Sequence, residues 1–313
     1  MRNRIIDLIE AEAAHDPRVT FLTGDLGFSV VEPLQTALGE RFINMGVAEA
    51  NMISVAGSLA ATGLKPLCYS ITPFITSRCF EQIRNDVVYQ QRAVRLIGVG
   101  SGFSYGTLGP SHHGLEDAAI MASLPELVVV NPANAAELDR VYAITHEAER
   151  PTYFRIAREN GVAFAVPIFS LDRGAYTLRE GADVTLVASG VTVTESLRAA
   201  DMLASEGVSA CVISVPVLSP FPRDTLARLL GDAPVVSVFE GYRGNPLSVG
   251  VMETLLGAGA REAYRDMNAP HSFPHVVGGT EFLRRNAGLD AASIAGAARE
   301  LAANRSNVRR FAR

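Results

Sequence analysis

Glu49 is the residue whose neighbours mark it most clearly for chemistry. It lies in Arg41–Met52 (RFINMGVAEANM), which indicates a short strand followed by a helix from about Ala48. A glutamate in a first helical turn complements the helix dipole. The helix that follows has no charged residue from Ala50 to Leu64, however. We therefore expect Glu49 to be half buried, and a buried carboxylate needs a partner or has a raised pKa.

This segment resembles a signature of the transketolase family, RF-I-N-x-G-(I/V)-A-E-x-N-M. Transketolases use thiamine diphosphate. The resemblance implies that Glu49 hydrogen-bonds N1′ of the cofactor's aminopyrimidine ring and thereby activates the cofactor. The alternative is that Glu49 is a helix-start carboxylate without chemistry, because a matching motif is a hypothesis until its context agrees.

The segment Tyr69–Asp86 resembles a second family pattern, F-x-x-F-(L/V)-x-R-A-x-(D/E)-Q-(I/V)-R, which places an aromatic ring against the pyrimidine. Phe74 is our candidate for that ring, since an aromatic face offers a flat apolar wall; plain core packing is the other interpretation. Arg78 either pairs with a carboxylate near the cofactor or lies on the surface. Asp25 ends the first expected strand, where ligands of open α/β sheets bind. The resemblance puts Asp25 near the thiamine, and an ordinary cap is its alternative.

A glycine-rich segment, Gly106–Ala118 (GTLGPSHHGLEDA), resembles the family loop G-P-T-H-x-x-x-E. An imidazole exchanges protons near neutral pH, and the resemblance implies that His112 contacts the substrate oxygen at the reacting carbonyl. The role of His113 is open. Adjacent side chains diverge and no carboxylate cluster converges with them, so we expect no metal at this pair.

Arg158 matches a family arginine that binds the substrate phosphate, a task that suits the donor fork of a guanidinium. The sequence departs from the common sugar-phosphate pattern at two places. Leu108 replaces an acidic residue that reads substrate hydroxyls, and residues 100–103 (GSGF) lack a phosphate-contacting His or Arg. We therefore expect a donor or acceptor other than the common pentose phosphates.

Strands and helices alternate along both halves of the chain. The expected strands are Val19–Leu22, Arg41–Ile43, Pro66–Tyr69, Ala93–Val99, Leu127–Val130, Thr152–Ile156, Val184–Val187, Ala210–Ser214, Val235–Phe239 and Glu262–Met267. The expected helices are Asn3–Ala14, Val31–Leu38, Ala48–Ala61, Phe74–Tyr89, Leu115–Leu124, Ala135–Glu147, Val193–Ser205, Arg223–Leu230, Pro246–Leu256 and Ser293–Ala303. Strands apolar on both faces and separated by helices indicate parallel sheets.

The predicted fold is therefore α/β with two successive parallel-sheet domains. We expect a pyrimidine-binding domain at residues 1–165, a linker at 166–182 and a transketolase C-terminal domain at 183–313. The resemblance gives the second domain no catalytic residue, because Gly241 stands where the family has a histidine after Glu240.

Composition excludes several functions. The net charge of −5 gives no basic field for nucleic acid, and no apolar run reaches membrane-spanning length. Three cysteines without metal spacing fit reduced thiols, so we expect the chain to be cytoplasmic. From the charge and the lack of a long apolar run, we expect that it binds neither nucleic acid nor membrane. The 48% hydrophobic and 19% charged residues suit a protein that buries surface against other subunits.

Binding a diphosphate through Mg²⁺ needs hard oxygen ligands beside a glycine turn. The family supplies them with G-D-G and a downstream Asn, whereas residues 24–26 (GDL) and 231–233 (GDA) lack the second glycine. The resemblance thus implies the carboxyl-terminal subunit of a split transketolase, which transfers a two-carbon ketol unit from a ketose to an aldose. Its partner would be an amino-terminal subunit that carries GDG…N and the Mg²⁺ ligands, in an α2β2 assembly acting on sugars or sugar phosphates.

Other functions stay open. The β subunit of a 2-oxo acid dehydrogenase shares the sheet order and the activating glutamate, but the loop GPSHHGLED and the ending GGTEFL fit transketolase better. Deoxyxylulose phosphate synthase is normally a single longer chain. A non-catalytic homologue is the third alternative, and the presence of Glu49 and His112 argues against it.

Overall fold

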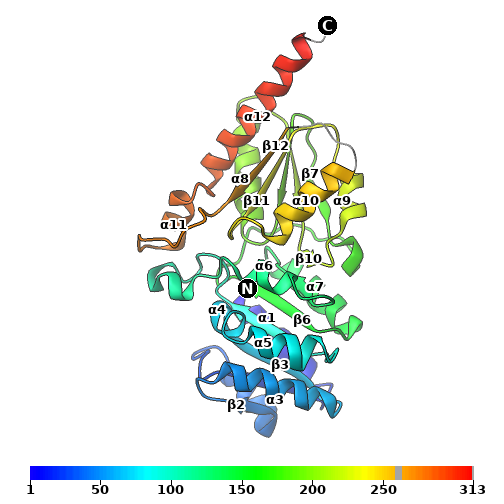
Figure 1. The fold of residues 1–313 in the computed structure, drawn as a ribbon, viewed down its shortest axis with the longest axis vertical. Coiled ribbons are helices and arrows are strands. Elements are labelled where there is room, and N and C mark those ends of the chain that lie inside the picture. The colour runs from blue at the N-terminus through cyan, green and yellow to red at the C-terminus, as the bar shows by residue number, and fades with distance from the viewer. Residues whose placement is uncertain (258–262, 312–313) are drawn as a thin grey trace.

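The computed structural model describes residues 1–257 and 263–311, which form two α/β domains stacked along the long axis of the molecule (Figure 1). The strands of the first domain are β1 (Val19–Thr23), β2 (Phe42–Asn44), β3 (Lys65–Ile71), β4 (Arg95–Val99), β5 (Val128–Val130) and β6 (Thr152–Ile156). Within the described chain the sheet runs β10-β5-β6-β4-β3-β1-β2, and its strands from β5 to β2 are parallel.

Helices cover both faces of this sheet (Figure 1). They are α1 (Arg2–Ala13), α2 (Glu32–Leu38), α3 (Glu49–Ala61), α4 (Thr72–Ile75), α5 (Phe80–Gln82), α6 (Asp117–Ala122) and α7 (Ala135–Ala148), with the π-helical turn η2 (Ile83–Val88) and the 3₁₀ turns η1 (Gly39–Arg41), η3 (Gly106–Leu108) and η4 (Pro110–His112). Successive residues of β1 serve opposite faces, because Phe21 packs in the core with α1 whereas Leu22 packs in the core with α3.

The second domain repeats the pattern. Its strands are β7 (Tyr176–Arg179), β8 (Val184–Ala188), β9 (Ala210–Ser214), β11 (Val235–Phe239) and β12 (Tyr264–Asn268), in the order β12-β11-β8-β9-β7 over the described residues. Its helices are α8 (Thr192–Ser205), α9 (Arg223–Leu229), α10 (Pro246–Gly257), α11 (Thr280–Asn286) and α12 (Ala291–Phe311), after the 3₁₀ turn η5 (Leu171–Arg173). Two mostly parallel sheets confirm the predicted fold class.

Two short edge strands, β7 and β10, were not predicted. β7 lies inside residues 166–182, the expected linker, and pairs antiparallel with β9. β10 (Val217–Ser219) comes from the second half of the chain but pairs antiparallel with β5 of the first sheet. Strands of three or four residues carry little pattern of their own and form because a distant partner is present. The exact domain boundaries stay predictions.

The single helix expected over Phe74–Tyr89 is wrong, because the structure divides it into α4, α5 and η2. Side-chain donors bond to or share backbone carbonyls in this segment, which competes with a regular helix. Thr76 Oγ1 donates to the carbonyl of Thr72 at 2.7 Å, and Cys79 Sγ donates to the carbonyl of Phe74 at 3.2 Å. The helix α11 was missed, and the strand expected from Glu262 begins outside the described residues.

The carboxyl ends of the parallel strands meet at one edge of the first sheet, and the site lies there. Asp25 follows β1, Glu49 follows β2 and Arg158 follows β6. The segment that carries Phe74 follows β3, and the histidine loop follows β4. In the described part of the chain, no helix has the length and apolar character needed to cross a membrane.

Candidate active site

Glu49 is more deeply buried than expected, with 1% of its surface exposed at the start of α3. Its Oε1 accepts a hydrogen bond from Ser70 Oγ at 3.1 Å, and its Oε2 accepts one from Arg78 Nη1 at 2.5 Å. Arg78 is thus the countercharge that a desolvated carboxylate needs. Burial and the Glu49 charge raise the pKa of the neighbouring Cys79 thiol to about 12, so this cysteine is no nucleophile at neutral pH.

Asn44, at the end of β2, organises the turn around Asp25. Its Nδ2 donates to Asp25 Oδ1 at 3.0 Å, while its Oδ1 accepts the backbone N–H groups of Asp25 and Gly46, each at 3.0 Å. Asp25 has a positive φ of 55°, which Asp tolerates better than most residues. Sequence reasoning did not select Asn44, although it lies within the same motif as Glu49.

Phe74 connects the Glu49 pair to the histidine loop. The guanidinium carbon of Arg78 lies 4.4 Å from the centroid of the half-buried Phe74 ring, a cation–π distance. The Phe74 and His112 rings meet edge to face with centroids 5.1 Å apart. Glu49, Arg78, Phe74 and His112 therefore form one continuous set of contacts, as the sequence motifs predict for neighbours in a single site.

Tyr105 extends this set toward Arg158. Its ring centroid lies 6.2 Å from that of His112, and the guanidinium carbon of Arg158 lies 5.0 Å from the Tyr105 centroid. Ser111 Oγ lies 3.0 Å from His112 Nδ1. The structure thus places every residue selected from the sequence at the same sheet edge, and it adds Tyr105.

A cavity of about 510 Å³ lies beside Arg158 and is also lined by Arg2, Arg4 and Asn160. Arg4 is paired with Asp139 at 2.6 Å. Arg2 and Arg158 bring two guanidinium groups to one cavity, and the acidic residue in its lining, Glu159, is paired with Arg284. This composition suits an anion. Arg2 was missed because it lies at the amino-terminal end, distant in the sequence from Arg158, and in no recognised motif.

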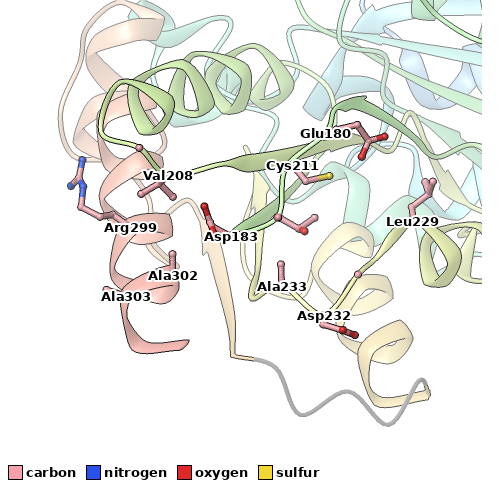
Figure 2. A pocket seen from close by; sticks show the side chains of 15 residues that line it. Glu180, Asp183, Val208, Cys211, Leu229, Asp232, Ala233, Arg299, Ala302 and Ala303 are labelled. Carbon is pink, nitrogen blue, oxygen red and sulfur yellow. The ribbon is translucent and has the colours of Figure 1, made fainter. Parts of the chain in front are cut away.

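Another large hollow lies in the second domain. It has a volume of about 830 Å³ and is found beside the amino ends of β8, β9 and β11, with Glu180, Cys211 and Asp232 in its lining (Figure 2). Burial raises the pKa of the Cys211 thiol to about 11, which keeps it protonated and unreactive at neutral pH. Among the described residues, its lining contains no histidine and no aromatic ring, in contrast to the site around Glu49.

His113 points into the protein rather than sharing the surroundings of His112. It is 2% exposed, and its ring meets Phe103 edge to face with centroids 5.4 Å apart. Its Nε2 lies 3.3 Å from the carbonyl oxygen of Gly106, so Nε2 carries the proton of the neutral ring. Burial lowers the pKa of His113. The two adjacent histidines diverge, as expected.

Fold and site describe a two-domain α/β protein with a polar site at the carboxyl edge of its first sheet. Two family models match the chain: the pyrimidine-binding domain of transketolase over residues 1–162, and the C-terminal domain of transketolase over residues 174–294. The chain belongs to the transketolase family and carries these two of its domains.

Individual relatives refine the comparison. The chain is 33% identical over 319 aligned positions to the 6-deoxy-6-sulfo-D-fructose transketolase subunit SqwH of Clostridium sp. (strain MSTE9), covering 99% of this chain and 96% of the relative. It is 31% identical over 303 positions to 1-deoxy-D-xylulose-5-phosphate synthase of Heliobacterium modesticaldum, covering 95% of this chain but 46% of the synthase. A solved structure described as a split gene transketolase, inactive beta4 tetramer, matches with a TM-score of 0.83 at 30% identity, covering 96% of this chain and 97% of the other. These findings support the split-transketolase prediction over the 2-oxo acid dehydrogenase alternative.

The buried His113 generates a prediction about pH. Because its folded pKa lies below the ordinary value of 6.5, the unfolded chain binds the proton more readily, and stability should fall as the pH drops below 6.5. We expect thermal unfolding midpoints measured from about pH 7.5 to 5.5 to fall less in His113→Asn than in the wild type. His15→Asn, at an exposed histidine, is the control. An equal fall in all three proteins would contradict this account.

Proposed function

We propose that this chain is the carboxyl-terminal subunit of a split transketolase, which transfers a two-carbon ketol unit from a ketose donor to an aldose acceptor with thiamine diphosphate. The observation that carries the proposal is the continuous set of contacts from the buried Glu49 through Arg78 and Phe74 to His112. Membership of the transketolase family supports it, as do split-transketolase relatives that match almost the whole chain.

The residues present fit the aminopyrimidine part of thiamine diphosphate. Glu49 offers a buried carboxylate that can accept a hydrogen bond from a ring nitrogen, and Phe74 offers an aromatic ring. Gly24 keeps the space beside Glu49 open, because a Cβ at that position would lie 3.2 Å from the carboxyl carbon. When bound, thiamine diphosphate would supply a nucleophilic carbon for the donor carbonyl and a thiazolium ring into which the electrons of the broken bond are delocalised.

Each selected residue has a role in this proposal. Glu49 holds the proton at the pyrimidine N1′, with Arg78 and Asp25 beside the cofactor and Phe74 against the ring. His112 exchanges a proton with the substrate oxygen through Nε2, because Nδ1 lies 3.0 Å from Ser111 Oγ. Arg158 binds the anionic end of the substrate.

We assign the Mg²⁺ and diphosphate site to an amino-terminal partner subunit that carries GDG…N, in an α2β2 assembly. A relative described as a transketolase subunit and a solved structure described as a split gene transketolase each match almost the whole chain, which supports this assignment. The described residues contain no group of three or more His, Cys, Asp or Glu side chains placed to hold a metal ion.

We propose a sugar substrate with an acidic substituent. Arg2 and Arg158 line the same cavity, so two guanidinium groups are available to an acidic group of the substrate. Leu108, which stands where the family has an acidic residue that contacts substrate hydroxyls, is 52% exposed. Two relatives carry names with such a substituent. One is the sulfo-sugar transketolase subunit described above, and the other is an apulose-4-phosphate transketolase subunit of Phocaeicola vulgatus, which is 28% identical over 81% of this chain and 83% of the relative.

Assembly provides the first test of this function. The isolated chain should bind thiamine diphosphate weakly in calorimetric titrations, because the Mg²⁺–diphosphate half of the site lies on the partner. Addition of the amino-terminal subunit should give tight, Mg²⁺-dependent binding and an α2β2 mass in sedimentation. Tight Mg²⁺-dependent binding to the chain alone would refute the split site.

Glu49→Gln tests the activating role. The amide keeps the shape of the side chain but cannot stabilise a proton on N1′, so turnover of the reconstituted complex should fall about 100-fold or more. The thermal unfolding midpoint should stay close to that of the wild type. Glu81→Gln, at an exposed glutamate of α5, should keep full activity. Turnover within a few-fold of wild type in Glu49→Gln would rule out the role.

Arg158→Ala tests the anion site. Loss of charge-assisted hydrogen bonds should raise the apparent KM for a phosphorylated substrate about tenfold or more, and raise that for an unphosphorylated analogue much less. Arg173→Ala, at an arginine whose side chain is 70% exposed on η5, is the control. An equal rise in KM for both substrates would show that Arg158 does not read the anionic group.

A further inference from the structure

The loop that carries His112, residues 102–114, is closed at its base by two backbone hydrogen bonds. Gly102 N donates to the Gly114 carbonyl at 2.7 Å, and Gly114 N donates to the Gly102 carbonyl at 3.0 Å. Tyr105 and His112 lie between these two ends. Whatever holds the ends of the loop therefore sets where the His112 ring lies.

Glu240, which follows β11 in the second domain, bonds one end of this loop directly and the other end through Arg155. Its Oε1 accepts the N–H of Phe103 at 2.8 Å, and its backbone carbonyl accepts Nη2 of Arg155 at 2.8 Å. The same Nη2 donates to the Gly114 carbonyl at 2.7 Å. Gly102 makes this approach possible: its φ is +59°, and a Cβ there would lie 2.1 Å from Glu240 Oε1.

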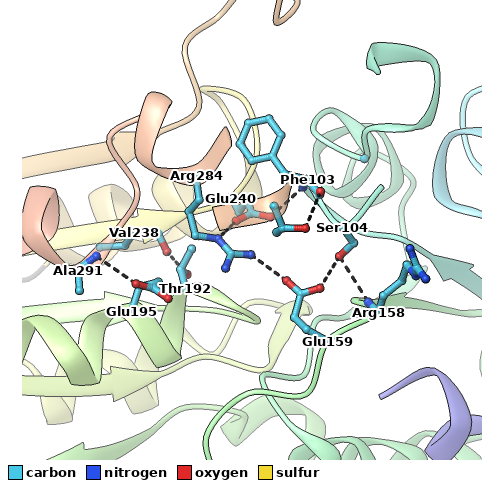
Figure 3. A network of polar contacts seen from close by, with 12 residues as sticks. Phe103, Ser104, Arg158, Glu159, Thr192, Glu195, Val238, Glu240, Arg284 and Ala291 are labelled. Carbon is cyan, nitrogen blue, oxygen red and sulfur yellow. Dashed lines mark hydrogen bonds and ion pairs between the residues drawn. The ribbon is translucent and has the colours of Figure 1, made fainter. Parts of the chain in front are cut away.

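Arg284 of α11 joins this anchor to the substrate side of the site (Figure 3). Its Nε donates to Glu240 Oε2, and its Nη2 donates to Glu159 Oε1 at 2.8 Å. Glu159 Oε2 in turn accepts Ser104 Oγ at 3.0 Å. Because Glu159 follows Arg158 directly, one buried arginine connects the His112 loop to the segment that presents Arg158.

These contacts fix geometry more than they add stability. Glu240 is 1% exposed and Arg284 is 7% exposed, and at such burial the desolvation cost offsets much of the attraction within an ion pair. A fully paired polar network nevertheless admits few arrangements, so it specifies the position of the chain segments it joins. The partners of the Glu49 carboxylate, Ser70 and Arg78, lie outside this network.

We propose that Glu240 and Arg284 are positioning residues: the second domain, to which the family resemblance gives no catalytic residue, sets the placement of His112 and Arg158 for transfer. This inference rests on the proposed function for its catalytic consequence, but the anchoring of the loop is a property of the chain itself. The two parts are therefore measured separately.

Hydrogen–deuterium exchange on the full chain tests the anchoring. Arg284→Met removes both ion pairs at similar side-chain length, and amides of residues 102–114 should then exchange about tenfold faster while those of β4 and β6 keep wild-type rates. Arg284→Lys, which restores the charge without the fork, should fall between the two. Arg285→Met, at the exposed neighbour on α11, should behave as wild type. Unchanged exchange in the loop, or equal acceleration in β4 and β6, would overturn the proposal.

Kinetics of the complex with the amino-terminal partner and thiamine diphosphate test the consequence. In Arg284→Met, kcat should fall about tenfold or more while the dissociation constant for thiamine diphosphate changes less than about twofold, because Glu49 and Phe74 lie outside the network. Glu240→Gln, which keeps the side-chain shape, should show the same split and serves if Arg284→Met does not fold. Unchanged kcat, or equal losses in kcat and cofactor affinity, would overturn the inference. An inactive wild-type complex would instead refute the proposed function and leave the exchange result to decide the anchoring.

Discussion

Burial of the Glu49 carboxylate is the constraint on which the rest of the site depends. Removing an ionised carboxylate from water is costly unless a countercharge and hydrogen-bond donors come with it. Ser70 and Arg78 meet that need, and both lie on or just after β3. The break in the helix after α4 places Arg78 against Glu49 and against the Phe74 ring at once. A departure from regular helix is thus part of how the charge is accommodated.

Much of the fold could be predicted because its signals are local. Fully buried strands such as β9 and β11 are mostly apolar runs, and their predicted bounds match the structure. The same reasoning applies to the site: residues that follow parallel strands lie at one edge of the sheet. Glu49 and His112 therefore belong to one set of contacts, through Arg78 and Phe74, although they are far apart in the sequence. A family motif then supplied the roles that spacing alone leaves open.

What the sequence did not indicate depends on contacts between distant segments. Arg2 reaches the cavity beside Arg158 only because α1 and the end of β6 lie together in the fold. Tyr105 gains a role through its position between His112 and Arg158, which no spacing reveals. The edge strand β10 forms on a sheet built mainly from the other domain. In each case the two contacting segments are too far apart in the sequence for a local residue pattern to indicate the contact.

The polar groups at the boundary between the domains explain why the second domain matters to the site. Arg155, 1% exposed in the first domain, places one donor on the Glu240 carbonyl of the second. Glu137 of α7 accepts hydrogen bonds from Tyr176 on β7 at 2.6 Å and Ser214 on β9 at 2.5 Å, and burial raises its pKa. Separation of the domains would leave such groups without their partners, at a cost of about 1–3 kcal/mol for each group that stays buried. The two domains therefore form one unit, and the geometry around His112 belongs to both.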